Sequence, residues 1–155
     1  MKITLVCVGK LKEDYWRDAM AEYTKRLSRY CTFDVVEVAE SRNQSRAKAD
    51  IDRAKQEEGE RILAACKGAV VALDLGGAEV SSEEIASFLQ QSQDKGQNLC
   101  FVIGGSDGLS PAVLDASSRR IRFGRITLPH QLCRVVATEQ IYRGFSIMNA
   151  TAYHK

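Results

Sequence analysis

The chain alternates between short apolar runs and longer amphipathic segments, and this alternation restricts its fold more than any other feature of the sequence. The apolar runs have the length of buried strands, and each is followed by a segment with helical spacing. Strands that alternate with helices predict an α/β fold with a largely parallel sheet. The predicted strands are Ile3–Val8, Phe33–Val38, Ala69–Leu75, Leu99–Ile103 and Ile121–Leu128.

The segments between the strands carry helix signals. Ser81 lies three residues before Glu84, which is the pattern of a capping box, and Ser110 precedes a proline that suits the first helical position. The chain has 155 residues and no repeat, and its polar stretch 39–49 is typical of a loop, so we expect a single domain over residues 1–155. The predicted helices are 15–27, Ala49–Cys66, a segment after Ser81, a short segment after Ser110, and Gln131–Met148.

Three strand ends have residues that suit a ligand site, namely Leu73–Gly77, Val102–Gly108 and Thr127–His130. In open α/β sheets ligands bind at the carboxyl ends of the strands, and glycine there lets the backbone approach a ligand. Each Gly-Gly pair is equally consistent with a tight turn, so both interpretations stay open. The GGSDG segment lacks the GxGxxG spacing and there is no P-loop motif, which argues against a dinucleotide or phosphate-cradling site.

The charge is distributed unevenly, although the net charge is only +2. Residues 1–118 contain 15 Lys and Arg against 19 Asp and Glu, a balance of −4, whereas residues 119–155 contain seven against one, a balance of +6. The small net charge alone argues against a general nucleic-acid binder. The basic C-terminal quarter is still able to bind an anionic partner locally.

The sequence has no apolar stretch of the ~18 residues that a membrane span requires, and its first residues lack the features of a signal peptide. We therefore expect a cytoplasmic protein with no membrane partner. The five cysteines are scattered and include no CxxC pair, which argues against a disulfide framework or a zinc site. We expect them to be packing residues.

Few residues suit proton transfer. The chain has two histidines: His130 follows a proline at a strand-to-helix junction, where a turn role is equally plausible, and His154 is the penultimate residue. Glu139 and Arg143 are four residues apart on the last helix, a spacing that favours a surface ion pair.

Four segments together resemble the ribosomal RNA large subunit methyltransferase H family: IGGSDGLSP at 103–111, TLPHQLCRVVATEQIYRGFSI at 127–147, the terminal AYHK and the initial MKITLVCVGKLK. The resemblance covers essentially the whole chain. It implies a SPOUT-class fold, with a deep trefoil knot in the C-terminal half around a mainly parallel sheet. It also implies a homodimer that uses S-adenosylmethionine and no metal to methylate N3 of a pseudouridine in helix 69 of 23S ribosomal RNA on the ribosome.

The resemblance also implies the site residues. Tyr153 and His154 match the C-terminal Tyr-His of the family and Arg143 matches the Arg of its Tyr-Arg pair, so these three are the expected catalytic residues. Histidine exchanges protons readily near neutral pH, which favours His154 as the base that removes the N3 proton. The expected cofactor-binding residues are Leu73, Gly104, Gly105, Phe123, Gly124, Arg125, Ile126, Thr127 and Leu128.

Two other functions remain open: a SPOUT methyltransferase that acts on another RNA such as transfer RNA, and a ribosome-binding module without catalysis. In each case the basic residues of the last quarter would contact RNA phosphates, and the alternative is a solvated basic face. These basic residues are Arg119, Arg120, Arg122, Arg125 and Lys155.

Overall fold

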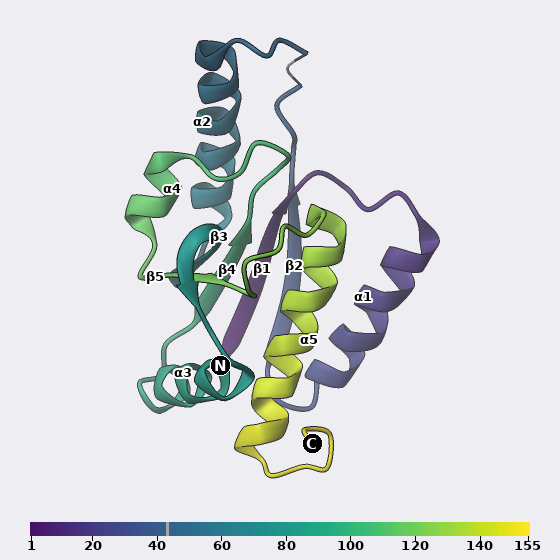
Figure 1. Cartoon of the computed structure of the whole chain (residues 1–155). Helices are drawn as coiled ribbons and strands as arrows, with labels where there is room; N and C mark the ends of the chain where they lie inside the picture. The colour runs from purple at the N-terminus through teal and green to yellow at the C-terminus, as the bar shows by residue number, and fades with distance from the viewer. Residues whose placement is uncertain (43) are drawn as a thin grey trace.

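The computed structural model describes residues 1–42 and 44–155 and contains one five-stranded sheet (Figure 1). The strands are all parallel and lie in the order β2-β1-β4-β3-β5. The expected α/β fold with a parallel sheet is confirmed. The strands are β1 (Lys2–Val8), β2 (Thr32–Val38), β3 (Ala69–Glu79), β4 (Leu99–Ile103) and β5 (Arg119–Arg122). The helices are α1 (Asp14–Leu27), α2 (Lys48–Ala65), α3 (Ser82–Asp94), α4 (Pro111–Ala116) and α5 (His130–Met148).

Helices cover both faces of the sheet, which explains why its central strands are apolar on both sides. On one face Ile3, Leu5 and Cys7 of β1 pack against α1, α3 and α5. On the other face Val6 and Val8 pack against α2 and α4. Within the described residues, no helix is both long and apolar enough to cross a membrane.

The predicted helix starts are confirmed by their hydrogen bonds. The Ser81 hydroxyl accepts from the Glu84 backbone N–H at 3.1 Å, and the Glu84 carboxylate accepts from the Ser81 N–H at 2.7 Å, which completes the capping box. Ser110 caps α4, and the proline occupies the first turn. The predicted loop ends at Ala47, the N-cap of α2, and Asn43 within it lies outside the described residues.

Two strand boundaries were predicted wrongly. The fifth strand ends at Arg122 instead of Leu128, because β5 lies at the sheet edge with β3 as its neighbour and the chain leaves the sheet at Gly124, whose φ is +108°. Conversely, β3 continues past Gly76 and Gly77 to Glu79, with a register shift against β5 between Leu73 and Ala78.

The Gly76-Gly77 pair therefore is not a tight turn. A Cβ on Gly77 would lie 2.6 Å from the backbone carbon of Arg120 and the nitrogen of Ile121. Glycine is required there because the bulged end of β3 touches the backbone of β5. The trefoil knot implied by the family stays a prediction.

Candidate functional site

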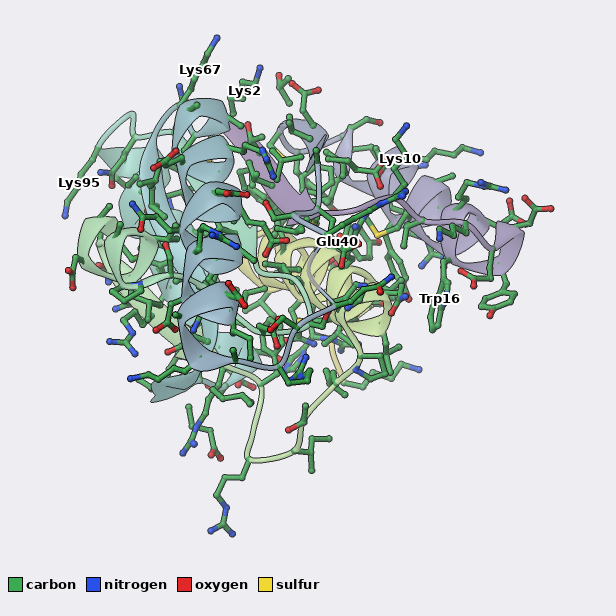
Figure 2. All side chains as sticks on the ribbon, turned by 90° about the horizontal axis from the view of Figure 1, so that it is seen from above. Lys2, Lys10, Trp16, Glu40, Lys67 and Lys95 are labelled. Carbon is green, nitrogen blue, oxygen red and sulfur yellow. The ribbon has the colours of Figure 1, made fainter. Side chains whose placement is uncertain are left out.

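A cavity of about 740 Å³ lies beside Leu73–Leu75 of β3, at the register shift of that strand, and at the end of β4. Figure 2 labels Lys10 and Glu40, which follow the ends of β1 and β2. Three segments form the cavity walls: Leu73–Leu75 with the end of β4 and the glycine turn that follows it, the stretch from the end of β5 to α5, and the first turn of α5. The lining residues are Leu73, Asp74, Leu75, Ile103–Leu109, Ile121–Gly124, Ile126–His130 and Cys133.

The turn after β4 is fixed by close backbone packing. The Gly108 N–H donates to the Gly105 carbonyl at 3.0 Å, and Gly108 has a φ of +85°. A Cβ on Gly104 would lie 2.6 Å from the carbonyl carbon of Gly108. Glycine at position 104 thus lets the turn fold back on β4, and the cavity wall there is backbone instead of side chain.

The loop between β5 and α5 gives the cavity an apolar rim. Ile126 is 68% exposed, and Leu75, which also lines the cavity, is 54% exposed. Phe123 packs inward against the core. Large apolar side chains at this exposure on a cavity rim are typical of a surface that a ligand or partner covers.

The first turn of α5 is held in place by a buried arginine. Arg134 is 1% exposed, and its guanidinium donates to the carbonyls of Val8 and Gly9 at 3.1 and 2.8 Å and to the Glu37 carboxylate at 2.8 Å. These contacts tie α5 to the ends of β1 and β2. Cys133, one residue earlier, is thereby fixed in the cavity wall.

Of the nine predicted cofactor-binding residues, the structure places all but Arg125 in the cavity lining. Arg125 is exposed on the same loop but does not line the cavity. Sequence reasoning missed Asp74, Asp107, His130 and Cys133 as lining residues, although each lies in or next to a segment that it had singled out. Asp107 forms an ion pair with Arg46 at 3.6 Å, which joins the turn to the loop before α2.

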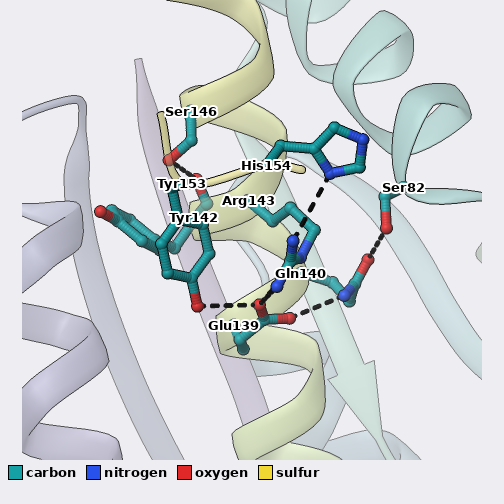
Figure 3. A network of polar contacts seen from close by, with 8 residues as sticks. All are labelled: Ser82, Glu139, Gln140, Tyr142, Arg143, Ser146, Tyr153 and His154. Atoms are coloured by element: carbon teal, nitrogen blue, oxygen red, sulfur yellow. Dashed lines mark hydrogen bonds and ion pairs between the residues drawn. The ribbon is translucent and has the colours of Figure 1, made fainter. Parts of the chain in front are cut away.

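The three predicted catalytic residues meet at the other end of α5, around the carboxylate of Glu139 (Figure 3). The Tyr153 hydroxyl donates to Glu139 Oε1 at 3.0 Å, and Arg143 donates to the same atom through Nε at 2.9 Å and Nη2 at 2.6 Å. Gln140 donates to Oε2 at 2.6 Å and accepts from Ser82 of α3. The Glu139–Arg143 pair is thus part of a network, with Glu139 only 15% exposed, and not an isolated surface pair.

The contacts of His154 favour one tautomer of the neutral imidazole. Arg143 Nη1 lies 3.4 Å from His154 Nδ1, and a guanidinium offers only donors, so Nδ1 carries the lone pair. The proton is then on Nε2, which donates to the Glu83 carboxylate of α3 at 3.0 Å. The pKa of Glu83 is lowered by hydrogen bonds from its own backbone N–H, from Ser81 and from this imidazole. His154 therefore presents an acceptor nitrogen beside Arg143.

Tyr153 is a protonated phenol in this network. Burial and hydrogen bonds with Tyr23 and Glu139 hold its pKa well above the ordinary value. Its ring lies edge-on to Tyr142, with centroids 4.7 Å apart, and the Arg143 guanidinium carbon is 4.7 Å from its centroid. Tyr153 is consequently suited to orient Arg143 and not to remove a proton.

Within one chain, the cavity and the predicted catalytic residues are far apart. His130 at the start of α5 lines the cavity, and Arg143 lies thirteen residues further along the helix. At 1.5 Å per residue, this separation is about 20 Å along the helix axis. Figure 1 shows the C-terminus near the far end of α5. The structure thus brings the cavity-lining residues together at one end of α5 and the predicted catalytic residues together at the other end. Within one chain it does not join these two groups.

Three of the predicted RNA-contacting arginines have partners within the chain. Arg120 pairs with Asp74 at 2.7 Å and Arg122 with Glu79 at 3.6 Å, while the Arg119 guanidinium lies 4.6 Å from the ring centroid of Phe88. Arg125 is exposed and has no polar contact within the described residues. Among residues 1–42 and 44–155, no group of three or more His, Cys, Asp or Glu side chains is placed to hold a metal ion.

Comparison with known proteins identifies the class. A family described as "Predicted SPOUT methyltransferase" matches residues 1–154. "Ribosomal RNA large subunit methyltransferase H" from Limosilactobacillus reuteri (strain DSM 20016) is 50% identical over 159 residues, which cover 100% of both chains. The protein of that name from strain JCM 1112 has the same identity and coverage. The chain therefore belongs to the SPOUT methyltransferases and, within them, to the ribosomal RNA large subunit methyltransferase H family.

A solved structure supports the fold independently. A probable methylase family protein from Haemophilus influenzae Rd KW20 superposes with a TM-score of 0.57 at 12% sequence identity, covering 99% of this chain and 70% of the other. At that identity the likeness concerns the fold alone.

Proposed function

We propose that the chain methylates N3 of a pseudouridine in helix 69 of 23S ribosomal RNA, using S-adenosylmethionine, and that it acts on the ribosome in the cytoplasm as a single-domain SPOUT protein over residues 1–155. The observation that carries this proposal is the glycine-walled cavity beside the register shift of β3 and the end of β4. The full-length similarity to proteins named for methylation of large-subunit ribosomal RNA supports the choice of substrate.

The cavity suits S-adenosylmethionine in size and chemistry. Its volume of about 740 Å³ lies within the range of small-molecule sites, and its lining is mostly apolar with a few polar groups. The rim residues Leu75 and Ile126 would cover an adenine, the backbone beside Gly104 would meet it closely, and Asp74 and Asp107 are available to the polar groups. The cofactor supplies a methyl group on a positively charged sulfonium.

The residues of the tail suit the RNA side of the reaction. N3 of a pseudouridine is a poor nucleophile while it holds its proton, so transfer needs a base and a positive charge beside the ring. Nδ1 of His154 takes the N3 proton after Arg143 Nη1 turns from Nδ1 to the ring carbonyls, where the guanidinium stabilises the negative charge that develops. Glu139 and Tyr153 hold Arg143 in position, which places these groups before the RNA arrives.

We further propose that the active enzyme is a homodimer in which the tail of one subunit completes the cavity of the other. The separation of about 20 Å along α5 prevents Arg143 from reaching the cavity of its own chain. A second copy packed against α5 would bring its own tail to the apolar rim around Ile126.

A mixed dimer tests this arrangement. Gly104→Val disables the cavity and His154→Ala disables the tail, so each homodimer is inactive. In a dimer of one copy of each, a shared site pairs the intact cavity of one chain with the intact tail of the other. Equal co-expression should then restore about a quarter of the wild-type rate, because half the dimers are mixed and each has one active site. If each tail serves its own cavity, no activity returns.

Mapping of methylated nucleotides in ribosomal RNA by mass spectrometry, with and without the protein, tests the reaction itself. Methyl transfer to purified transfer RNA instead of ribosomes would favour the first alternative. A chain that binds ribosomes but gives no heat with S-adenosylmethionine in calorimetry would favour the non-catalytic module.

A further inference from the structure

Two cysteines that the sequence had assigned to packing lie in contact. Cys66 follows the last turn of α2 and Cys100 is the second residue of β4, and their sulfur atoms are 2.7 Å apart. A disulfide bond is about 2.05 Å long, so the two sulfurs need to approach by only a fraction of an ångström more. The chain separates these residues by 34 positions, and the fold brings them together.

Both backbones are fixed independently of the thiols. The Cys66 N–H donates to the carbonyls of Ile62 and Leu63 at 3.1 and 3.2 Å, which anchors the end of α2. Cys100 is fully buried in β4, between β1 and β3. The approach of the two sulfurs is therefore a property of the packed core and not of a mobile loop.

The two thiols have different accessibility and different acidity. Cys66 is half-buried and is thus the more accessible residue of the two to a small oxidant, whereas Cys100 has no exposed surface. A hydrogen bond from the Cys100 thiol lowers the pKa of Cys66. Burial instead raises the pKa of Cys31 and of Cys133 to about 11. Because the thiolate is the reactive form, Cys66 is the most reactive of the half-buried thiols.

We propose that Cys66 and Cys100 form a peroxide-sensitive, reversible disulfide site, in which Cys66 reacts first and Cys100 resolves the product. The Cys66 sulfur attacks one oxygen of hydrogen peroxide and the O–O bond breaks, which gives a sulfenic acid and one water. The Cys100 sulfur then attacks the Cys66 sulfur, the S–O bond breaks, and the leaving hydroxide takes up the Cys100 proton as a second water. The two thiols lose two electrons and two protons, and a dithiol reductant reverses the reaction.

The site lies away from the proposed reaction centre. Cys100 is near the amino end of β4, and Gly104 follows the carboxyl end of the same strand. The separation is four residue steps along the strand, about 13 Å. Oxidation should thus cross-link α2 to the sheet and raise the melting temperature, and it should leave cofactor binding unchanged.

Peptide mapping tests the proposal directly. The full-length protein is treated with hydrogen peroxide, blocked with iodoacetamide and digested with trypsin. We expect ILAACK (62–67) cross-linked to GQNLCFVIGGSDGLSPAVLDASSR (96–119), and dithiothreitol should release the two peptides. Oxidation of Cys66 to the sulfinic acid without a cross-link would overturn the proposal, as would faster oxidation of Cys31 than of Cys66.

Matched variants separate the two roles. Cys100→Ser should leave a Cys66 sulfenic acid that dimedone traps, whereas Cys66→Ser should leave Cys100 reduced. Cys31→Ser, the control, should form the cross-link at the wild-type rate. Thermal melts of each reduced variant verify folding. If a thiol variant does not fold, the rate of iodoacetamide labelling in the wild-type protein still tests whether Cys66 is the reactive thiol. Cys66 should label at least about tenfold faster than Cys31, and equal rates would contradict its role.

Discussion

The two ends of α5 contrast in how their sites are built. At the start of the helix, the cavity wall is backbone and apolar side chain, and Gly104 has no room for a Cβ. At the far end, the tail residues are held by polar side chains that converge on Glu139. A wall made of backbone fails when atoms are added, whereas a polar network fails when one donor or acceptor is removed. The two ends should thus respond to opposite kinds of substitution.

The largest effect is expected at the polar end. His154→Ala should lower the rate of methyl transfer by about 100-fold or more, since it removes the base, and should leave the cofactor dissociation constant within about twofold. Single-turnover methylation of ribosomes and calorimetry measure the two quantities. His154→Asn keeps a donor for Glu83 and an acceptor for Arg143 but cannot take a proton, so it should be as slow as the alanine variant. Full turnover in either variant would contradict the assignment of the base.

At the backbone end, Gly104→Val should weaken cofactor binding by about 100-fold, because the added carbons collide with Gly108 and displace the turn. Calorimetry with S-adenosylmethionine measures the change. Gly96→Ala is the control: it also adds a Cβ at a glycine in a turn, but in open space away from the cavity, at a φ of +63°. Equal affinity in the wild type and in Gly104→Val would show that the turn does not contact the cofactor.

Glu139→Gln sharpens the contrast, because it replaces the acceptor of Arg143 and Tyr153 with a group that also donates. We expect kcat to fall about tenfold with the cofactor affinity unchanged. Ser82→Ala, at the edge of the same network, should stay near the wild-type rate. A loss of cofactor affinity in Glu139→Gln would mean that the two ends are not independent.

Arginine substitutions should have smaller effects on RNA binding. Arg125→Ala should weaken ribosome binding a few-fold and reduce the salt dependence by about one counterion, because this exposed side chain has no partner among the described residues. Arg120→Ala should change the salt dependence less, since Arg120 already pairs with Asp74. Equal salt slopes for Arg125→Ala and the wild type would argue for a solvated basic face.

The smallest effect concerns stability at high pH. Folding raises the pKa of Tyr153, so the protonated phenol is favoured in the folded state. Its contribution to the free energy of unfolding is complete below pH about 10, the pKa in the unfolded chain, and is lost as the pH rises above that value. Denaturant titrations should show a steeper alkaline loss in the wild type than in Tyr153→Phe. If the stability of both proteins fell equally with rising pH, the raised pKa of Tyr153 would be contradicted.

The features that the sequence predicts well are those with local causes. The capping box at Ser81 and the buried strand Leu99–Ile103 follow from patterns a few residues long, and both are confirmed. The location of the cavity follows from the rule that ligands bind at strand ends. The three predicted ligand segments, Leu73–Gly77, Val102–Gly108 and Thr127–His130, all contribute residues to its lining.

The features that the sequence does not predict depend on distant partners. Leu128 extends an apolar pattern, but no strand lies beside it to continue the sheet. The sequence around Gly77 is consistent with a turn. Glycine is needed there, however, because the backbone of β5, 43 residues later in the chain, leaves no room for a Cβ. The contact of Cys66 with Cys100 and that of Glu83 with His154 join residues 34 and 71 positions apart, and no local spacing reports them.

The buried Arg134 has a consequence for the order of folding. Its guanidinium reaches carbonyls 125 and 126 residues earlier in the chain, so the pocket that receives it exists only after β1 and β2 have paired. Contacts over such sequence distances slow folding, because a long loop must close before they form. During synthesis, the first forty residues leave the ribosome long before α5 does. The protein therefore becomes complete only when its final helix docks onto its earliest strands, and a chain truncated before Arg134 would lack the tie that fixes one wall of the cavity.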